Sequence, residues 1–435
     1  MSKRVILWFR SDLRLHDNEA LNEAIKHGDE IIPLYVFDER VFKGATNFGF
    51  RKTGHHRAQF IIESVRSLRD AFREKGSELI VRTGLPEEVI YEMARNYKTQ
   101  YVLCNRERTQ EEVMVQDALE KKLWTIGQEL RYSRGKMLYY TQDLPFPVTH
   151  TPDSFTQFRK EVEKIVPIRP PYPVPETFKP PSVLIEPGTI PDLTDFNYVS
   201  GNGTPANSFF KGGEKEGLKR LHAYLWENDY LKCYGEQGSG LKEGISSSRL
   251  SPWISIGCLS PKLVFRELKR YEAERKNKDK VAAMILELEW RDFLRLMAKK
   301  YGNAIFQRGG VIGNVNFSPT SDKRLMDMWK TGKTPQPFVN ASINELISTG
   351  YLNRICRYAA ASYLVHDLNL DWRIGASFFE SYLFDYDPAS NWMNWNYIAG
   401  LGPDSKELRL VSIPNLAAKY DPKGEYQAYW GDRRY

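Results

Sequence analysis

Short apolar segments alternate with helical segments through about the first 130 residues of the chain. The strand candidates are rich in branched and aromatic residues and span 5–9, 30–37, 78–82 and 101–104. The helical candidates span 18–27, 57–75, 86–96 and 111–127. Alternation at this spacing predicts an α/β domain with a doubly wound parallel sheet. Because no G-x-G-x-x-G sequence follows the first strand, we do not expect this domain to bind a dinucleotide in the Rossmann manner.

The rest of the chain changes character twice. Between 145 and 207, proline-rich pieces such as Ile168–Pro173 predict extended chain, interrupted by one helix near 154–165. Beyond 207 the pattern is helical almost throughout, with helices expected at 213–228, 260–276, 279–300, 322–330, 341–349, 352–367 and 371–383. We therefore predict an α/β domain over 1–140, a linker over 141–207 and an all-α domain over 208–435.

Charge and cysteine content narrow the class of protein. The 435 residues carry a formal net charge of +7, which suits a polyanionic partner, although a simply solvated basic surface is the commoner explanation. None of the four cysteines has C-x-x-C spacing, and Cys104 and Cys258 have apolar neighbours, so we expect buried thiols in a reducing cytoplasm. We see no signal peptide, no apolar run long enough to cross a bilayer and no metal-ligand pattern around His55-His56.

Paired acids and interleaved aromatic residues crowd into the run Asp385–Tyr397. A buried tryptophan needs a partner for its indole N–H, and a buried aspartate needs a donor or a cation. Upstream, Arg357 can pair with Asp385 or Asp387 and so satisfy an acid that is buried. The run is typical of a pocket wall that holds a large planar guest able to form hydrogen bonds.

Two further segments carry candidate binding residues. Tyr234 precedes the run Ser246–Trp253, whose consecutive hydroxyls and helix-opening proline offer donors to phosphate, although an ordinary helix N-cap explains them as well. Within a helical segment, Glu287, Trp290 and Arg291 share a face that can stack on and hydrogen-bond a base. An amphipathic helix with an internal ion pair is the commoner explanation of such a face.

Together these residues resemble the cryptochrome/photolyase family, and most closely its DASH branch. The motifs that carry the resemblance, in chain order, are Trp8–Asn18, Lys52–Gly54, Glu63–Val65, Thr151–Lys160, Ser251–Trp253, Gly257–Pro261 and Asp385–Tyr397. The run Thr151–Lys160 is particularly similar to DASH members. Because separated motifs occur in the family's order over nearly the whole chain, the resemblance is specific.

The resemblance implies an FAD held in the helical domain, from which blue light drives an electron into a cyclobutane pyrimidine dimer flipped out of DNA. Carried over by position, the FAD phosphates would be held by Tyr234, Ser247, Ser248, Arg249, Leu250 and Ser251. The isoalloxazine and ribityl region would meet Arg357, Asp385 and Asp387, with Asn391 facing flavin N5. The lesion would meet Trp290 and Tyr397 by stacking and Glu287, Arg291 and Arg354 by polar contact. Trp395 and Trp372 would begin a photoreduction relay, although two tryptophans by themselves usually mean core.

The family commonly has an antenna between its domains, and the resemblance places a reduced folate, methenyltetrahydrofolate, beside Asn105 and Glu107. Acids at a helix start also complement the helix dipole, which leaves the antenna's identity open. The chain departs from the family pattern at Gly238, Asn340, Arg354, Leu416 and Pro319. These changes remove a cation and amides from the DNA-facing positions, so the sequence supports FAD binding more strongly than it supports repair. Because the third relay tryptophan is replaced, the electron relay would exit through Tyr351 or Tyr358.

Three hypotheses follow from the sequence. The first is a light-driven photolyase of DASH type that uses reduced FAD, acts preferentially on dimers in single-stranded DNA and is a monomer. The second is a blue-light flavin photoreceptor with weak or no repair, which the altered DNA-facing positions favour. The third is a basic nucleic-acid-binding protein without flavin, which would require several ordered motifs to coincide by chance.

Overall fold

The computed structural model describes residues 3–198, 210–235, 241, 247–314, 316, 318–404 and 412–431. Its amino-terminal part is a five-stranded parallel sheet made of β1 (Arg4–Phe9), β2 (Glu30–Asp38), β3 (Ile80–Gly84), β4 (Tyr101–Asn105) and β5 (Glu129–Ser133). The strand order β3-β2-β1-β4-β5 is doubly wound, because the chain moves outward from β1 in both directions. The predicted α/β class is confirmed, with β5 as an additional edge strand.

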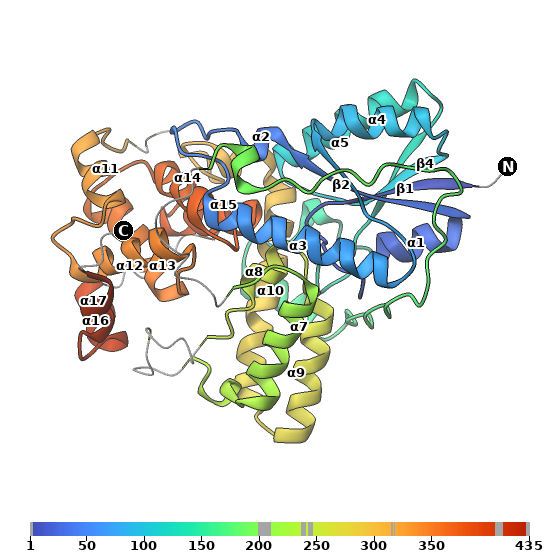
Figure 1. The fold of residues 1–435 in the computed structure, drawn as a ribbon. Helices are drawn as coiled ribbons and strands as arrows, with labels where there is room; N and C mark the ends of the chain where they lie inside the picture. The colour runs from blue at the N-terminus through green and yellow to red at the C-terminus, as the bar shows by residue number, and fades with distance from the viewer. Residues whose placement is uncertain are drawn as a thin grey trace.

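Helices cover both faces of the sheet (Figure 1). They are α1 (Glu19–His27), α2 (Glu39–Phe42), α3 (His55–Glu74), α4 (Pro86–Asn96) and α5 (Gln110–Trp124). Alternate residues of a strand face opposite sides. Val5, Leu7 and Phe9 accordingly lie in the core that includes α1 and α3, whereas Ile6 and Trp8 lie in the core beneath α4 and α5.

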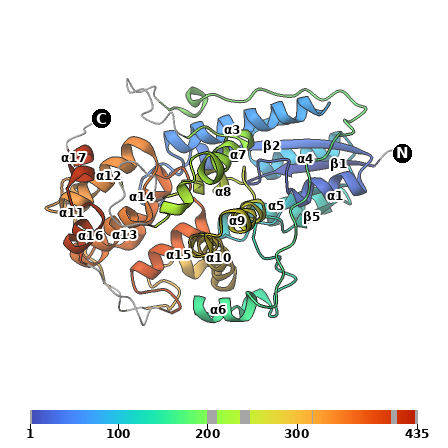
Figure 2. The ribbon, with the colours of Figure 1, turned by 90° about the horizontal axis from the view of Figure 1, so that it is seen from below.

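The proline-rich region runs as extended chain along the sheet part. The Val81 amide donates to the Pro187 carbonyl at 2.8 Å, and the Ile31 amide donates to the Lys179 carbonyl at 3.1 Å. These bonds satisfy the backbone of a segment in which proline lacks N–H donors. The region contains short 3₁₀ turns at Val148–His150 and Leu193–Phe196, and α6 (Phe155–Val162) packs near α10 (Figure 2).

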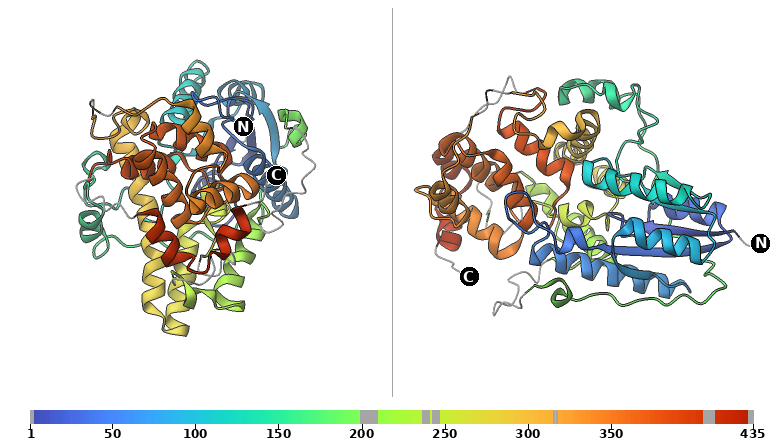
Figure 3. Two further views of the ribbon diagram at one scale, coloured as in Figure 1. Left: turned by 90° about the vertical axis from the view of Figure 1, so that its left-hand side faces the viewer. Right: turned by 90° about the horizontal axis from the view of Figure 1, so that it is seen from above.

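The second half of the chain is helical, as predicted. Its longer helices are α7 (Glu214–His222), α9 (Pro261–Arg275), α10 (Lys278–Tyr301), α11 (Lys323–Lys330), α12 (Pro337–Thr349), α13 (Arg354–Ser362), α14 (Trp372–Tyr382), α15 (Pro388–Ile398), α16 (Ile413–Tyr420) and α17 (Glu425–Gly431). Shorter turns are α8 (Ser251–Ser255) and the 3₁₀ segments Tyr230–Cys233 and Gly302–Phe306. Both α7 and α13 continue into a π-helical turn, at Ala223–Glu227 and Tyr363–Asp367. Figure 3 shows this helical part beside the sheet.

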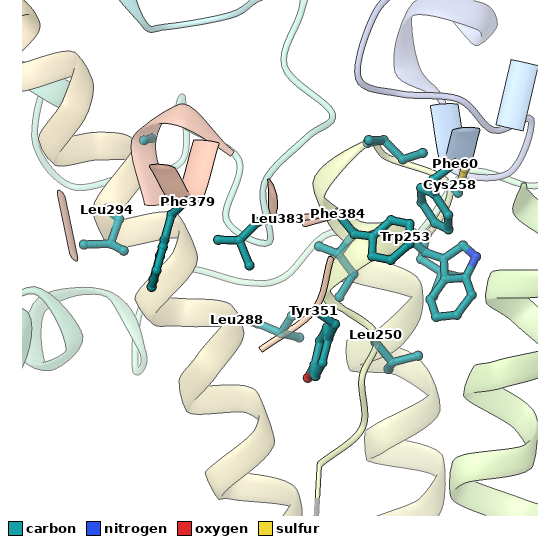
Figure 4. Close-up of a cluster of buried hydrophobic side chains, with 14 of the residues drawn as sticks. Phe60, Leu250, Trp253, Cys258, Leu288, Leu294, Tyr351, Phe379, Leu383 and Phe384 are labelled. Carbon is teal, nitrogen blue, oxygen red and sulfur yellow. The ribbon is translucent and has the colours of Figure 1, made fainter. Parts of the chain in front are cut away.

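One apolar core runs without a break from the sheet part into the helical part. Phe60 of α3 lies 5.8 Å from Trp253 of α8 and 5.5 Å from Phe384, measured between ring centroids. Figure 4 shows these rings beside Cys258, with Tyr351 and Leu288 deeper in the helical part. Because the carboxyl ends of the strands point toward this junction, polar residues that follow β1 and β4 meet residues of the helical part there.

Candidate functional site

The run of acids and aromatics folds into a capped helix. Asp387 is the N-cap of α15, its carboxylate accepts a hydrogen bond from the Ser390 amide at 2.9 Å, and Pro388 occupies the first helical position. Asn391 and Trp395 point inward and are buried, whereas Tyr397 is half-buried. The sequence therefore uses one helix to present polar groups to the interior and an aromatic ring toward the surface.

Arg357 and Asp385 form an ion pair at the inner side of this helix. The guanidinium of Arg357 donates to the Asp385 carboxylate at 2.7 Å and to the Leu352 carbonyl at 2.8 Å. Burial disfavours the charged guanidinium, but the carboxylate beside it raises the pKa of Arg357. The second carboxylate oxygen of Asp385 is buried and accepts no hydrogen bond from the described residues. Such an oxygen suits a donor on a bound ring, so the pair fits a flavin.

Asp387 belongs to a buried charge network that joins the helical part to the sheet part. Arg295 of α10 lies 2.5 Å from Asp387 and 3.1 Å from Glu107, and Lys136 pairs with Glu107 from the other side. Burial by itself would raise the pKa of Asp387, but Arg295 and Arg291 overcome it and lower the pKa to about 2. The carboxylate is therefore held charged at the N-terminus of α15.

The predicted antenna residues are both committed to internal bonds. Asn105 is buried, donates to Asp12 and accepts from the Ser133 hydroxyl at 2.7 Å. Glu107 is only 2% exposed, and its two oxygens pair with Lys136 and Arg295. The structure thus assigns these side chains to the junction between the two parts and leaves them no free group to offer a ligand directly.

Residues of the predicted phosphate-binding loop, Ser247–Ser251, lie near the ring of Tyr351. The Tyr351 hydroxyl lies 3.4 Å from the Ser247 hydroxyl, and the ring centroid lies 5.6 Å from the Arg249 guanidinium carbon and 5.8 Å from that of Arg357. Arg249 adopts a left-handed backbone conformation with φ of 53°. The loop therefore lies beside the Arg357–Asp385 pair, as a cofactor with a ring at one end and phosphates at the other requires.

The other predicted phosphate-binding residues differ in burial and in hydrogen bonding. The Ser248 carbonyl accepts from Arg220 at 3.0 Å, Leu250 is buried, and Ser251 is exposed at the start of the short helix α8. Tyr234 is half-buried; burial raises the pKa of its phenol, and the charge of Glu287 raises it further. Gly238 lies outside the described residues.

The predicted lesion-stacking rings are neighbours. Trp290 of α10 and Tyr397 of α15 lie 5.3 Å apart between centroids, and the Trp290 indole N–H donates to the Asn394 side chain at 3.3 Å. Glu287 forms an ion pair with Arg354 at 3.2 Å, in which the Arg354 side chain is 78% exposed. These two pairs form a polar and aromatic surface above the inner site.

Arg291 does not join that surface, contrary to the shared face expected from the sequence. Its guanidinium donates to the Lys136 carbonyl at 2.9 Å and lies 3.6 Å from Asp292. Its side chain is only 13% exposed. A position one residue beyond Trp290 is turned by about 100° around the helix, which directs Arg291 to the junction with the sheet part.

The relay tryptophans are buried. Trp395 packs against Gly375 of α14 and against Phe379, whose ring lies 5.1 Å away. The Trp372 ring lies 5.7 Å from Trp392, and the Trp392 indole N–H donates to the Tyr386 hydroxyl at 3.3 Å. The sequence analysis did not single out Trp392, although its place three residues before Trp395 on a helix would have put it near the same site.

The departures from the family pattern have local structural roles. Asn353 is the N-cap of α13 and accepts from the Ile355 amide at 2.9 Å, so its amide is used within the helix. Asn340 bonds the backbone and hydroxyl of Thr334, and Leu416 is buried. Pro319 is half-buried.

The described part of the chain contains no cluster of three or more His, Cys, Asp or Glu side chains arranged to hold a metal ion. Among the same residues, no helix is both long and apolar enough to pass through a lipid bilayer. All four cysteines are free thiols, and Cys104, Cys258 and Cys356 are buried, as expected for the first two.

Comparison with known proteins places this geometry in a family. Residues 5–176 match the DNA photolyase family and residues 284–432 match the FAD binding domain of DNA photolyase. Cryptochrome DASH of Synechocystis is 42% identical over 98% of this chain and 87% of its own length. The crystal structure of a Synechocystis cryptochrome superposes with a TM-score of 0.93, covering 99% of this chain and 89% of that chain at 42% identity. A bacterial class III photolyase from Agrobacterium tumefaciens gives a TM-score of 0.85 at 26% identity, over 99% of this chain and 86% of that chain. The chain belongs to the cryptochrome/photolyase family and is similar to DASH cryptochromes of that family.

Proposed function

We propose that the protein is a light-driven, FAD-dependent DNA photolyase of DASH type that splits cyclobutane pyrimidine dimers, with a preference for single-stranded DNA. One observation carries the proposal. The packed helices α10 and α15 present Trp290 and Tyr397 toward the surface and hold Arg295 and Asp387 on their inner side. Bases stacked on the two rings would therefore lie close to a ring bound at the inner site.

The inner residues fit FAD. Asp385 would accept a hydrogen bond from the flavin ring through its unused oxygen, while Arg357 holds that carboxylate in place. Asp387 and Asn391 would face the ring and ribityl chain, and the loop of Ser247–Ser251 with Tyr234 would hold the phosphates. When bound, FAD supplies light absorption and one-electron transfer. The protein's own contribution is to bind, orient and shield that group.

Lesion recognition would rest on the outer surface. Trp290 and Tyr397 would stack on the two bases of the dimer, since aromatic stacking tolerates any base. Glu287 and Arg354 would make the polar contacts, and Arg291 would act indirectly by fixing α10 against the sheet part. A single strand suits this site because a base that is already unpaired costs least to extrude.

Electron supply to the inner site would begin at Trp395 and Trp372. Since Pro319 stands at the third relay position, Trp392 is the aromatic residue that continues from Trp372 in this structure. Tyr351 lies among Ser247, Arg249 and Arg357 and so belongs to the cradle rather than to this path.

The proposal keeps a reduced folate, methenyltetrahydrofolate, as the antenna and assigns it to the α/β domain over 1–140. Asn105 and Glu107 would support it through the junction rather than by direct contact, because their side chains are already bonded. Purified protein should then show a near-ultraviolet absorbance band separate from that of flavin. If protein without folate responds to light as strongly as protein with folate, the proposal that folate is the antenna is refuted.

Binding of dimer-containing DNA tests the site. Trp290→Ala should weaken binding of a dimer-containing single strand by about 1–3 kcal/mol, the usual contribution of one base stacked on an aromatic ring. Trp226→Ala is a matched control, because Trp226 is also half-buried and its indole N–H also bonds a side chain, Glu267, at 3.3 Å. Equal effects of the two substitutions, with flavin content unchanged, would refute this placement of the lesion.

A blue-light photoreceptor with weak or no repair is the second candidate. It is favoured by Asn353, whose amide caps α13, and by Arg354, which is exposed at the position where the family has an active-site asparagine. A protein of this kind would change its flavin redox state in light without discriminating dimer-containing DNA from undamaged DNA.

A further inference from the structure

A basic hollow of about 700 Å³ lies at the amino-terminal edge of the sheet. Figure 1 shows that β1 begins at the end of the molecule away from the helical part. Its walls come from the residue before β1, the ends of α1 and α4, the turns that follow α4 and α5, and the beginnings of β4 and β5. The cationic side chains of the lining are Lys3, Arg95, Lys98 and Arg131. The carboxylate among the lining residues, Glu129, already pairs with Arg131 at 3.1 Å. The lining therefore has an excess of positive charge that suits an anionic ligand.

A buried hydroxyl also points to a ligand here. Tyr101 lines the hollow and is only 5% exposed, and its hydroxyl oxygen forms no hydrogen bond with any described residue. The Arg131 guanidinium carbon lies 4.0 Å from the centre of its ring. Burial raises the pKa of Tyr101, Arg131 opposes this, and the charges of Glu23 and Asp29 raise it further, so the phenol stays a donor. An anionic oxygen bound in the hollow would accept from this hydroxyl beside the charge of Arg131.

An exposed tryptophan ends helix α5, immediately before the turn that lines the hollow. Trp124 is the last residue of α5, and its side chain is 80% exposed, whereas most tryptophans are largely buried. Two residues later, Ile126 lines the hollow. Helix α5 packs beside α4, whose end supplies Arg95 and then Lys98. Single-stranded nucleic acid is bound by exposed aromatic side chains that stack on bases together with cations that hold phosphates, and α5 and α4 supply one of each kind at this edge.

Helix-dipole complementarity does not account for all of these residues. Cations in the last turn of a helix are stabilised by its carbonyl ends, which explains Arg95 by itself. Lys3 and Arg131 lie outside helices, and neither the Tyr101 hydroxyl nor the exposure of Trp124 serves a helix end. The cations of the hollow, the Tyr101 hydroxyl and Trp124 are therefore better explained by a bound ligand than by the helix dipole.

We propose that this hollow and Trp124 form a second nucleic-acid site, which binds the phosphates of a single strand while an unpaired base stacks on the indole. The site goes beyond the proposed repair function and needs neither light nor a lesion. It lies at the amino-terminal edge of the sheet, away from helices α10 and α15, which carry Trp290 and Tyr397 (Figure 1), so one long strand would be held at two places.

Dark binding of an undamaged strand tests the site on the flavin-loaded protein. The probe is a labelled oligothymidylate of about 20 nucleotides, longer than a typical single site, followed by fluorescence anisotropy over a range of salt concentrations. Arg95→Glu with Lys98→Glu should weaken binding and reduce the slope of log K against log salt by about 1.4, since each phosphate contact on a single strand contributes about 0.7. Trp124→Ala should weaken binding roughly 5- to 150-fold.

Matched controls separate this site from general charge and from the repair site. Arg275→Glu with Lys278→Glu reverses two exposed cations, the last residue of α9 and the first of α10. Met114→Ala removes an apolar side chain that is 62% exposed on α5. Both should leave the affinity and the slope near wild type. The effects of the test variants should persist in a Trp290→Ala background, where the repair site is weakened.

Each outcome decides the proposal. Test variants that keep flavin and unfolding temperature and bind like their controls refute the second site. If the charge reversal weakens binding of the oligothymidylate but Trp124→Ala does not, no base stacks on the indole. The proposed preference for single strands is then refuted. Should the double charge reversal fail to fold, Trp124→Ala alone decides, because a side chain 80% exposed contributes little to the core.

Discussion

Replacing Arg295 with methionine tests the buried charge network that joins the two parts of the molecule. The side chain of Arg295 is 5% exposed and lies 2.5 Å from Asp387 and 3.1 Å from Glu107. Methionine has a similar length but removes the cation from between two buried carboxylates. Breaking a buried ion pair from one side typically costs about 3–5 kcal/mol, because the remaining charge stays desolvated. We expect Arg295→Met to destabilise the protein by that amount near neutral pH.

The pH dependence gives an independent measure of the same network. The pKa of Asp387 is about 2 in the folded protein, below its ordinary value in an unfolded chain, so the carboxylate stabilises the fold above about pH 4. This contribution, about 2–3 kcal/mol by linkage, is lost as the pH falls from about 4 to about 2. Without Arg295 the pKa of Asp387 rises, and the acid limb of the stability curve should move to higher pH.

Urea unfolding of flavin-loaded protein, followed by far-ultraviolet circular dichroism from about pH 2 to 8, measures both effects. Arg73→Met is the matched control, because Arg73 is 53% exposed and pairs with Glu78 on the surface. Removing an exposed pair costs at most about 1 kcal/mol. If Arg295→Met costs no more than Arg73→Met, or if its acid limb coincides with that of wild type, the network does not stabilise the junction as argued.

Three further predictions follow from single positions. Burial raises the pKa of Glu345 to about 7 in spite of a hydrogen bond from Tyr426, so the contribution of this carboxyl to folding stability falls as the pH rises from about 4 to 7. In thermal unfolding, Glu345→Gln should therefore equal wild type near pH 4 and be more stable than wild type at pH 8, by up to roughly 3 kcal/mol. A Cβ added at Gly375 would lie 2.1 Å from Cη2 of Trp395, so Gly375→Ala should cost about 1–3 kcal/mol in urea unfolding and shift the tryptophan fluorescence, and an unchanged midpoint would contradict the packing. Trp372→Phe should slow photoreduction of oxidised flavin, measured by absorbance, while leaving chemical reduction unchanged; equal photoreduction rates would remove Trp372 from the relay.

Local sequence patterns were sufficient for most of the fold. The short continuous apolar runs and the helical runs between them specify a parallel sheet, because strands covered by helices on both faces are apolar throughout. The strand β5 was missed because it is short and lies at the sheet edge, where Glu129 and Arg131 are exposed and alternate with buried residues. Alternation of this kind was the available signal for an edge strand.

The candidate site divides into residues that a helix brings together and residues that only the tertiary fold brings together. Asp387 and Tyr397 share one helix, so the spacing of the run already placed them on one element. Arg295, Lys136 and Glu107 meet across the junction from distant parts of the chain, and no local pattern relates them. For the same reason, Glu107 was predicted from the sequence to contact a ligand, whereas in the structure it pairs with Lys136 and Arg295.

Light-dependent repair tests the central claim most directly. Purified, chemically reduced protein would be illuminated with a single-stranded oligonucleotide that contains one thymine dimer, and flavin absorbance would be recorded on the same sample. The account predicts loss of the dimer in light above a dark control, which would also show that Arg354 and Leu416 are compatible with repair. A fully reduced, flavin-loaded protein that leaves the dimer intact would contradict the photolyase assignment and favour the photoreceptor.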